Sequence, residues 1–427
     1  MTRGLYTLSL HILLPFALLR LYWRSLKSPA YRKRISERLA IQPAGPAAQV
    51  WVHAVSVGEV QAAEPLIRRL LARDPPTRVL VTTTTPTGAE RLRARFAARV
   101  PHRYTPFDLP AVVGRFLDQT DPSLVIVMET EIWPNMLATC AARGIPVILA
   151  NARLSERSAR GYRRVARLTG EALRCFDIIA AQSEADAQRF IALGAEPRRV
   201  AVTGSIKFDL CSPAGLLDQA EAMRRFWGAG RPVWVAASTH DGEDEPVLMA
   251  HKHVRAAVPG ALLVLVPRHP ERFDRVADLV VKQGLTLARR SRREPCEPST
   301  AVFLGDTMGE LPVFIAAADA AFIGGSLVPA GGHNLLEAAS VGVPVAVGPH
   351  HFNFAAITDS LCSAGGAARV ADATELADLM VAWLTDATER ARIGEKGRQV
   401  VEQNRGALER LMRCVEARLT PKPAAGN

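Results

Sequence analysis

From residue 50 onwards, short apolar runs rich in β-branched residues alternate with longer stretches in which apolar residues recur at helical spacing. Apolar runs of about four to seven residues between amphipathic segments are typical of βαβ units, in which helices cover both faces of a parallel sheet. The runs predicted to be strands are residues 50–55, 78–84, 124–128, 146–151, 177–183 and 199–205, and then 233–238, 262–268, 301–305, 320–325 and 343–348. The expected fold class is therefore α/β with parallel sheets.

The alternation is interrupted once, at residues 209–230, which contain a single helix-like stretch. We therefore expect a first domain over residues 41–208, a linker over 209–230 and a second domain over 231–427 that ends in a helical tail. Two βα-repeating halves of similar size predict a protein of two lobes with a cleft between them.

Residues 1–40 precede this pattern and begin with an apolar run over residues 5–19. The run is short for a membrane span, which needs roughly 20 apolar residues, but Tyr22–Trp23 extend it as typical interfacial anchors. Because basic residues follow the run, we expect an uncleaved membrane anchor with the rest of the chain on the cytoplasmic side. A helix that never crosses the membrane is the alternative, since Pro15 and His11 weaken a span.

The net charge of +11 is concentrated in the same segment, where eight Lys or Arg residues stand against one acid, Glu37. Residues 1–40 thus carry +7, and the rest of the chain carries +4. A basic tract beside an apolar run is typical of contact with anionic lipids, so we expect these lipids and no nucleic acid as partners. The basic residues are Arg3, Arg20, Arg24, Lys27, Arg32, Lys33, Arg34 and Arg38.

The first predicted strand is followed by Ser56 and Glu59, spaced as S-x-x-E. This is the capping-box signature, in which the glutamate satisfies a backbone N–H at the start of a helix. The carboxyl end of a strand is also where open α/β folds place reactive groups. The spacing alone favours the cap and leaves a catalytic role open.

Other polar residues of the first half also follow predicted strands. Glu129 and Glu131 come after residues 124–128, and Lys207 follows residues 199–205. The two acids could equally be charges at a helix N-terminus. Because the carboxyl ends of parallel strands meet at one edge of the sheet, we expect a ligand site there.

The densest pattern of the second half is residues 322–349, with glycine pairs at 324–325 and 331–332. Glycines let backbone N–H groups approach an anion such as a phosphate closely. His333 and Glu337 are expected on one face of a helix, where the carboxylate could bind the hydroxyls of a ribose. The alternative is an ordinary glycine-rich loop with an exposed glutamate.

Two further segments end strands of the second half. Arg268 at the end of residues 262–268 could meet a phosphate or carboxylate or be a surface residue, and the backbone at Met308–Glu310 could contact a base or ribose. The chain contains no P-loop, no G-x-G-x-x-G, no H-E-x-x-H and no D-x-D motif, so we expect no bound metal.

Nine motifs in order along nearly the whole chain resemble the 3-deoxy-D-manno-octulosonic acid (Kdo) transferases of lipopolysaccharide synthesis. They are SVGE, TTTTPTGAERL, METEIWPN, NARLSERS, TGSIKFD, STHDGE, PRHPER, GDTMGEL and GGHNLLE. The resemblance implies the GT-B glycosyltransferase fold, with two Rossmann-like lobes, an acceptor site in the first and a nucleotide-sugar site in the second. It also implies transfer of Kdo from CMP-Kdo to the lipid A precursor (lipid IVA) at the inner membrane, with inversion and without a metal or other cofactor.

The resemblance assigns roles to individual residues. Glu59 is implied to be the general base, and Glu129 and Lys207 to stabilise the transition state, with Glu131 as the alternative to Glu129. The residues implied to bind CMP-Kdo are Arg268, His269, Met308, Gly309, Glu310, Asn334, Leu335, Leu336 and Glu337. A carboxylate at a helix N-terminus is favoured in its ionised form, so we expect Glu59 to be deprotonated at neutral pH.

Two other functions are compatible with the residues. One is a GT-B transferase that uses a UDP-sugar. The other is a membrane-tethered nucleotide-binding scaffold without turnover.

Overall fold

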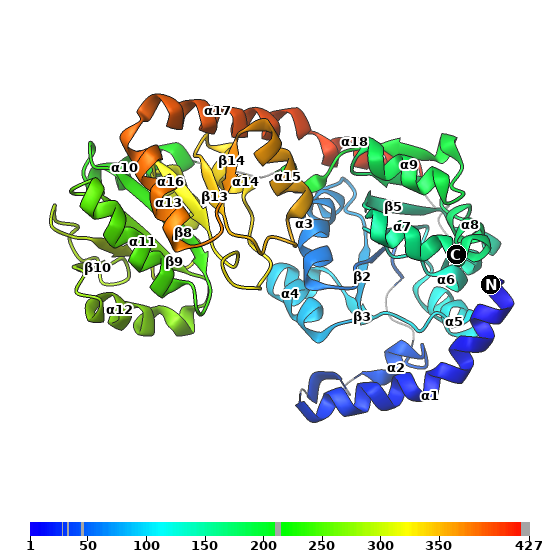
Figure 1. Cartoon of the computed structure of the whole chain (residues 1–427). Helices are drawn as coiled ribbons and strands as arrows, with labels where there is room; N and C mark the ends of the chain where they lie inside the picture. Colours follow the sequence, from blue (N-terminus) through cyan, green and yellow to red (C-terminus); the bar gives the residue numbers. More distant parts are fainter. Residues whose placement is uncertain (28, 32–33, 44–46, 210–214, 420–427) are drawn as a thin grey trace. The chain divides into compact units, whose positions relative to one another are not determined.

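The computed structural model describes residues 1–27, 29–31, 34–43, 47–209 and 215–419. The chain forms two compact units, Met1–Asp209 with the chain from Arg405 onwards, and Leu210–Asn404. Figure 1 shows their helices and strands, with labels on those for which there is room.

The first unit contains a parallel seven-stranded sheet in the order β3-β2-β1-β4-β5-β6-β7. Its strands are β1 (Val50–His53), β2 (Val79–Thr83), β3 (His102–Tyr104), β4 (Leu124–Met128), β5 (Val147–Ala152), β6 (Ile178–Ala181) and β7 (Val200–Val202). Its helices include α3 (Val57–Leu71), α4 (Pro86–Phe96), α5 (Pro110–Thr120), α6 (Pro134–Ala142), α7 (Glu156–Arg163), α8 (Ala166–Leu173), α9 (Glu184–Ala192) and the short η4 (Ile206–Phe208).

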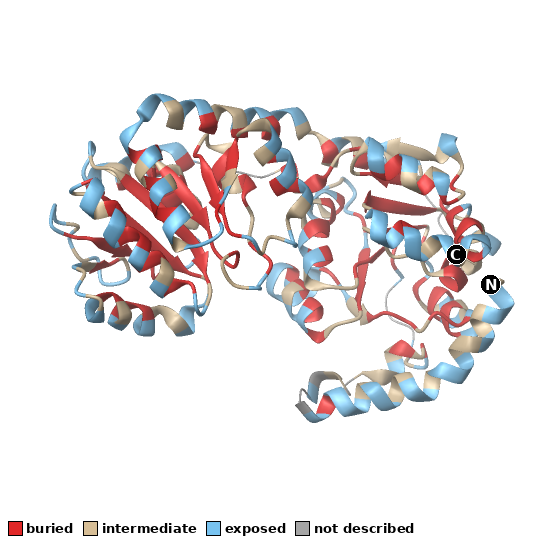
Figure 2. Cartoon of the chain, in the orientation of Figure 1, coloured by how far each residue is buried: buried red, intermediate tan, exposed pale blue. Residues whose placement is uncertain are grey.

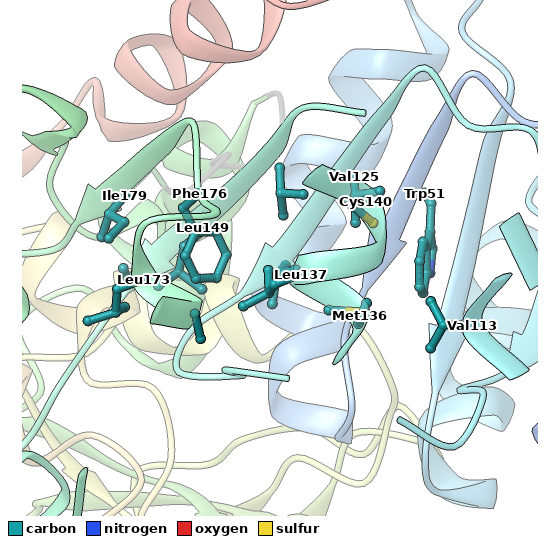
Figure 3. Packing of buried hydrophobic residues seen from close by; sticks show 14 of the residues in the cluster. Trp51, Val113, Val125, Met136, Leu137, Cys140, Leu149, Leu173, Phe176 and Ile179 are labelled. Carbon is teal, nitrogen blue, oxygen red and sulfur yellow. The ribbon is translucent and has the colours of Figure 1, made fainter. Parts of the chain in front are cut away.

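Side chains of this sheet alternate between two buried cores. Trp51, Val125 and Leu149 pack in one cluster with helices α5, α6 and α8 (Figure 3). Val52 and Ile126 point to the other face and pack with α3 and α4. The near-continuous apolar strands follow from this burial on both faces.

The second unit has a parallel seven-stranded sheet in the order β10-β11-β9-β8-β12-β13-β14. Its strands are β8 (Val233–Thr239), β9 (Leu262–Pro267), β10 (Leu287–Arg289), β11 (Val302–Leu304), β12 (Ala320–Ile323), β13 (Val345–Val347) and β14 (Ala367–Arg369). Its helices include α10 (Leu216–Trp227), α11 (Asp244–Ala257), α12 (Phe273–Lys282), α13 (Leu311–Ala316), α14 (Leu336–Ser340), α15 (Ala355–Ala364), α16 (Ala373–Thr385) and α17 (Ala387–Asn404). The expectation of two Rossmann-like α/β units is confirmed.

The linker and the helical tail join the units differently from the expected boundaries. Residues 210–214 of the expected linker lie outside the described residues, and α10 belongs to the second unit, where Trp227 packs on Phe314 of α13. The last helix, α18 (Ala407–Glu416), packs with the first unit. Its start is held by the Asp209 carboxylate, which accepts the N–H of Gly406 at 2.6 Å.

The N-terminus forms helix α1 (Arg3–Lys27), which is long and apolar enough to cross a membrane by length and composition. Exposed and partly exposed residues alternate along it (Figure 2). A short helix, α2 (Ile35–Arg38), follows. Arg32 and Lys33 of the expected basic tract lie outside the described residues.

Candidate active site

The candidate catalytic residues of the first unit lie where the strand order reverses. From β1 the chain continues to β2 and β3 on one side of the sheet, and then to β4 on the other side of β1. Glu59 follows β1, and Glu129 follows β4. The loops after such a strand pair leave a crevice at the carboxyl edge of a parallel sheet, which is the usual ligand position in this architecture.

Glu59 is the capping residue that the S-x-x-E spacing predicts. Ser56 is the N-cap of α3, and its Oγ accepts the N–H of Glu59 at 3.3 Å. In return the Glu59 carboxylate accepts the N–H of Val55 at 2.9 Å and the Ser56 hydroxyl at 3.0 Å. The side chain is therefore held in one position at the end of β1.

The expectation that Glu59 is deprotonated at neutral pH is wrong. The residue is only 7% exposed, and this burial, together with the charges of Glu131 and Glu129, raises its pKa to about 8. The bonds from Val55 and Ser56 act in the opposite direction but are outweighed. At a buried site, desolvation destabilises the ionised carboxylate by more than the helix N-terminus stabilises it.

Glu129 and Lys207 lie together in the same region. The Lys207 Nζ is 3.8 Å from Glu129 Oε1, and both side chains are about one-quarter exposed. Glu129 has a positive φ of 57°, and its N–H bonds to the carbonyl of Ala150 on the neighbouring strand. Non-glycine residues held in this strained conformation are concentrated at functional sites.

Glu131 is the more restrained of the two acids. Its Oε2 accepts the indole N–H of Trp133 at 2.6 Å, and burial raises its pKa. Its charge is the strongest electrostatic influence on Glu59. Glu131 is therefore a neighbour of the base candidate, whereas Glu129 is the acid that pairs with Lys207.

Asn151, which no sequence pattern marks as a site residue, supports this cluster from β5. Asn151 is fully buried with a φ of 53°, and its Oδ1 accepts the N–H of Ile206 at 3.2 Å. This bond fixes the start of η4, which carries Lys207. The positive φ and the long-range bond have no signal in the local sequence.

The second unit has a corresponding reversal between β8 and β12, and three histidines meet there. His240 follows β8, and its ring stacks on His333 with centroids 5.0 Å apart and Nε2 atoms 2.8 Å apart. His269, after β9, meets His240 edge-on at 5.4 Å. Burial, with nearby Arg268, lowers the pKa of His333 to about 4, so its ring is neutral.

Arg268 and Glu337 face the same cluster. The Arg268 charge acts on both His333 and Glu337. Burial raises the pKa of Glu337, against the opposing effects of Arg268 and of the Asn334 amide, which donates to Glu337 Oε1 at 3.2 Å. The predicted residues Arg268, His269, Asn334 and Glu337 are thus brought together.

The prediction that His333 and Glu337 share a helix face is wrong. Helix α14 begins only at Leu336, because the Asn334 side chain accepts the N–H of Leu336 and starts the helix there. Leu335 and Leu336 are fully buried, backbone included, so neither residue has surface that a ligand could contact.

The first glycine pair does not offer its N–H groups to an outside anion. The fully buried Glu243 carboxylate accepts the N–H groups of Gly325, Ser326 and Leu327 at 2.6, 2.9 and 2.9 Å. It also accepts the N–H of His240 at 2.8 Å. The anion that this loop binds is therefore part of the chain, and the N–H of Gly324 bonds to the carbonyl of Ala237, so neither N–H of this glycine pair is available to a phosphate.

The Met308–Glu310 turn follows β11, which pairs with β9. Met308 is 66% exposed and Gly309 has a φ of 91°. Glu310 forms a bidentate ion pair with Arg290. This ion pair lowers the pKa of Glu310. The turn is thus held from the side of Glu310, while Met308 is exposed. Within the described residues, no group of three or more His, Cys, Asp or Glu side chains could hold a metal ion.

Two Rossmann-like units with parallel sheets, each with a polar cluster at the reversal of its strand order, are the architecture of the GT-B fold. A solved UDP-GlcNAc 2-epimerase from Neisseria meningitidis has the same fold. It is 14% identical, covers 85% of this chain and 99% of its own, and superposes with a TM-score of 0.54.

The sequence profile of the "3-Deoxy-D-manno-octulosonic-acid transferase (kdotransferase)" family matches residues 33–210. The 3-deoxy-D-manno-octulosonic acid transferase of Haemophilus influenzae is 43% identical over 96% of this chain and 97% of its own length. The protein of the same name from Bordetella pertussis is 40% identical over 97% of this chain and 99% of its own length. The chain therefore belongs to the 3-deoxy-D-manno-octulosonic-acid transferase family.

Proposed function

We propose that the chain transfers Kdo from CMP-Kdo to the lipid A precursor (lipid IVA), with inversion at the anomeric carbon and without a metal or other cofactor. The observation that carries the proposal is the cluster of Glu59, Glu129 and Lys207 at the strand reversal of the first unit, in a chain of this family.

Glu59 is the general base for the acceptor hydroxyl. Its carboxylate is held by Val55 and Ser56, and a pKa of about 8 makes it a stronger base than an ordinary glutamate once its proton has left. Positioned acid–base catalysis contributes roughly 10²–10⁴-fold to a rate. Attack of the activated hydroxyl on the face opposite to the departing CMP gives inversion.

Glu129 and Lys207 stabilise the charges that develop during transfer. Loss of CMP leaves positive charge on the sugar ring, which a carboxylate such as Glu129 stabilises, and negative charge on the phosphate, which an ammonium such as Lys207 stabilises. At a separation of 3.8 Å the two groups form an ion pair, and each is at hand for the charge of opposite sign on the substrate.

The histidine and arginine cluster of the second unit binds the nucleotide part of CMP-Kdo. Arg268 supplies a cation for the phosphate, and Glu337, on the same cluster, accepts hydrogen bonds from ribose hydroxyls. The remaining contacts come from His269, the backbone of Met308, Gly309 and Glu310, and Asn334. Leu335 and Leu336, which are fully buried, hold the flanking Asn334 and Glu337 in position.

We also place the protein at the cell inner membrane, with its α/β units on the cytoplasmic side. The apolar helix α1 and the basic residues that follow it support this location, since the anionic lipids of the cytoplasmic leaflet attract basic segments. The lipid A precursor is itself an anionic lipid and is available at the same surface.

The proposal is tested by incubating the full chain with CMP-Kdo and lipid IVA and reading the product by mass. We expect Glu59→Gln to lower transfer by roughly 10² or more, with the melting temperature maintained, because glutamine can still cap α3. The matched control is Glu90→Gln on the exposed side of α4, which should leave transfer unchanged. Full transfer by Glu59→Gln would rule out the base role, and a product formed only from a UDP-sugar would rule out the donor.

A further inference from the structure

One face of helix α1 is an uninterrupted apolar stripe. Seven large apolar side chains recur at spacings of three and four residues, and each is 57–74% exposed. They are Leu5, Leu8, Ile12, Phe16, Leu19, Trp23 and Leu26. Such spacing places all seven on one side of a helix over about 31 Å.

The opposite face of α1 is attached to the first unit. Leu10 and Leu14 pack against the buried core cluster that contains residues of α5 and α6. The Tyr6 hydroxyl donates to Asp108 Oδ2 at 2.9 Å, and the Thr7 hydroxyl donates to Asn135 Oδ1 at 3.0 Å. The N-terminal half of the helix is therefore held to the α/β unit by both apolar and polar contacts.

Asp108, which accepts the hydrogen bond of the Tyr6 hydroxyl, is itself held in place by the first unit. It is 5% exposed, and its two carboxylate oxygens also accept the N–H groups of Asn135 and Met136 at the start of α6. The Asn135 amide bonds back to the Asp108 carbonyl at 2.7 Å. The residues that hold Tyr6 and Thr7 are thus fixed by the fold of the unit itself.

The chain that follows α1 is attached close to the same place. The Glu37 carboxylate accepts the N–H of Tyr104 at 2.9 Å, and the carbonyl of Arg38 accepts the N–H of Phe107 at 2.8 Å. Tyr104 and Asp108 are four residues apart, so their Cα atoms are at most about 14 Å apart. A spanning α1 would instead put Tyr6 and Glu37 on opposite sides of a hydrocarbon core about 30 Å thick.

We propose that α1 does not cross the bilayer but lies in the plane of one leaflet, with its apolar stripe in the acyl region and its opposite face on the first unit. The partner is an anionic lipid surface, because exposed Arg20 and Arg24 border the stripe at headgroup level and Trp23 lies within it. The inference concerns the mode of attachment and does not depend on the transferase activity.

Labelling distinguishes the two orientations directly. A side chain at Gly4 would meet nothing within 4 Å, so Gly4→Cys is tolerated at the helix start. The full-length Gly4→Cys protein is added to the outside of preformed phosphatidylethanolamine and phosphatidylglycerol vesicles and treated with a membrane-impermeant maleimide. The parent chain gives the background from the native cysteines. We expect labelling above background without detergent, whereas protection until detergent is added would overturn the proposal.

A matched pair of substitutions tests the depth of each face. Ile12 and Leu13 are neighbours with exposed fractions of 61% and 54%, but Leu13 is rotated by about 100° away from the centre of the stripe. We expect Ile12→Glu to weaken co-flotation with the same vesicles by roughly 10-fold or more, because an apolar side chain that enters the acyl region is replaced by a charged one. We expect Leu13→Glu to have a much smaller effect. In a spanning helix both residues lie in the hydrocarbon core, so equal losses would overturn the proposal, as would a parent chain that does not float with the vesicles.

Discussion

At the scale of single residues, Glu59 is subject to two opposing effects, since the cap favours its ionised form and burial favours its protonated form. Because the pKa is raised to about 8, the fraction of active base grows as the pH rises towards 8 and levels off above it. We therefore expect kcat/KM, which reports the free enzyme, to increase about tenfold per pH unit below this pKa and to reach a plateau above it. Initial rates between pH 6 and pH 9.5 check this prediction.

Glu131, next to Glu59, provides the control for the pH dependence of kcat/KM. Glu131 is the strongest charge that raises the pKa of Glu59, and Glu131→Gln can retain the acceptor for the Trp133 indole. The ascending limb should therefore move to lower pH in this variant. A profile that is flat across the whole range would contradict the assignment of Glu59 as the titrating base.

Glu243 is the residue whose role the sequence conceals most. It stands in an acidic stretch that is typical of a helix start, yet its carboxylate replaces the expected external anion in the loop after β12. In Glu243→Gln the side-chain NH2 group replaces a carboxylate oxygen, so it faces backbone N–H groups that then have no acceptor. We therefore expect the second unit to lose about 2–4 kcal/mol of unfolding free energy. Thermal unfolding and the hydrogen-exchange rates of the β8–β14 sheet both measure this loss.

Glu245→Gln is the appropriate comparison, since Glu245 is two residues away and exposed. It should leave the exchange rates of the sheet unchanged. Equal stability of the two variants would show that the four N–H groups do not need the Glu243 charge.

Residues that follow strands could be located from the sequence, but their partners could not. Glu59, Glu129 and Lys207 were predicted together because the ends of parallel strands share one edge. Asn151 and His240 were not identified, because the contacts that give them their roles join segments far apart in the chain, at 55 and 93 residues of separation. Burial, which decides the pKa of Glu59, is likewise a property of the packed unit.

At the scale of elements, the interior strands were predictable and most edge strands were not. All eleven predicted runs contain a strand, and the three additional strands, β3, β10 and β14, are each an edge of a sheet. Each of these edges has only three residues, with partly exposed positions. A short strand that is paired on one side has no continuous apolar run, so it gives no signal above that of a loop.

Helix α17 depends on a close backbone contact that only glycine allows. A Cβ at Gly394 would lie 1.9 Å from the carbonyl oxygen of Gly342, which follows α14. We expect Gly394→Ala to separate α17 from α14 and to destabilise the second unit by about 1–3 kcal/mol. The measurement is hydrogen exchange in α14 and α17.

Gly161 in α7 is the control, because a Cβ there meets nothing within 4 Å. Gly161→Ala should stabilise its helix by up to about 1 kcal/mol, since alanine has the higher helix propensity. If Gly394→Ala were equally neutral, the contact with Gly342 would not limit the packing of α17.

At the scale of the whole molecule, the chain order and the folded units do not coincide. The helical tail reads as one continuous pattern, but its last helix completes the core of the first unit. Leu411 and Val415 of α18 are fully buried beside residues of α3 and the first sheet. The sequence could predict the amphipathic face of α18 but not which of the two cores that face would join.

This arrangement predicts where the effect of a C-terminal substitution appears. Leu411→Ala removes a buried side chain from the first unit and should cost it about 2–5 kcal/mol. Exchange should therefore accelerate in β1–β7 although the substitution is about 200 residues further along the chain than β7, and it should stay unchanged in β8–β14. Met380→Ala in α16, a buried residue of the second core, should give the reverse pattern. Faster exchange in β8–β14 after Leu411→Ala would mean that α18 stabilises the unit that precedes it in sequence, and the division of the tail would then be wrong.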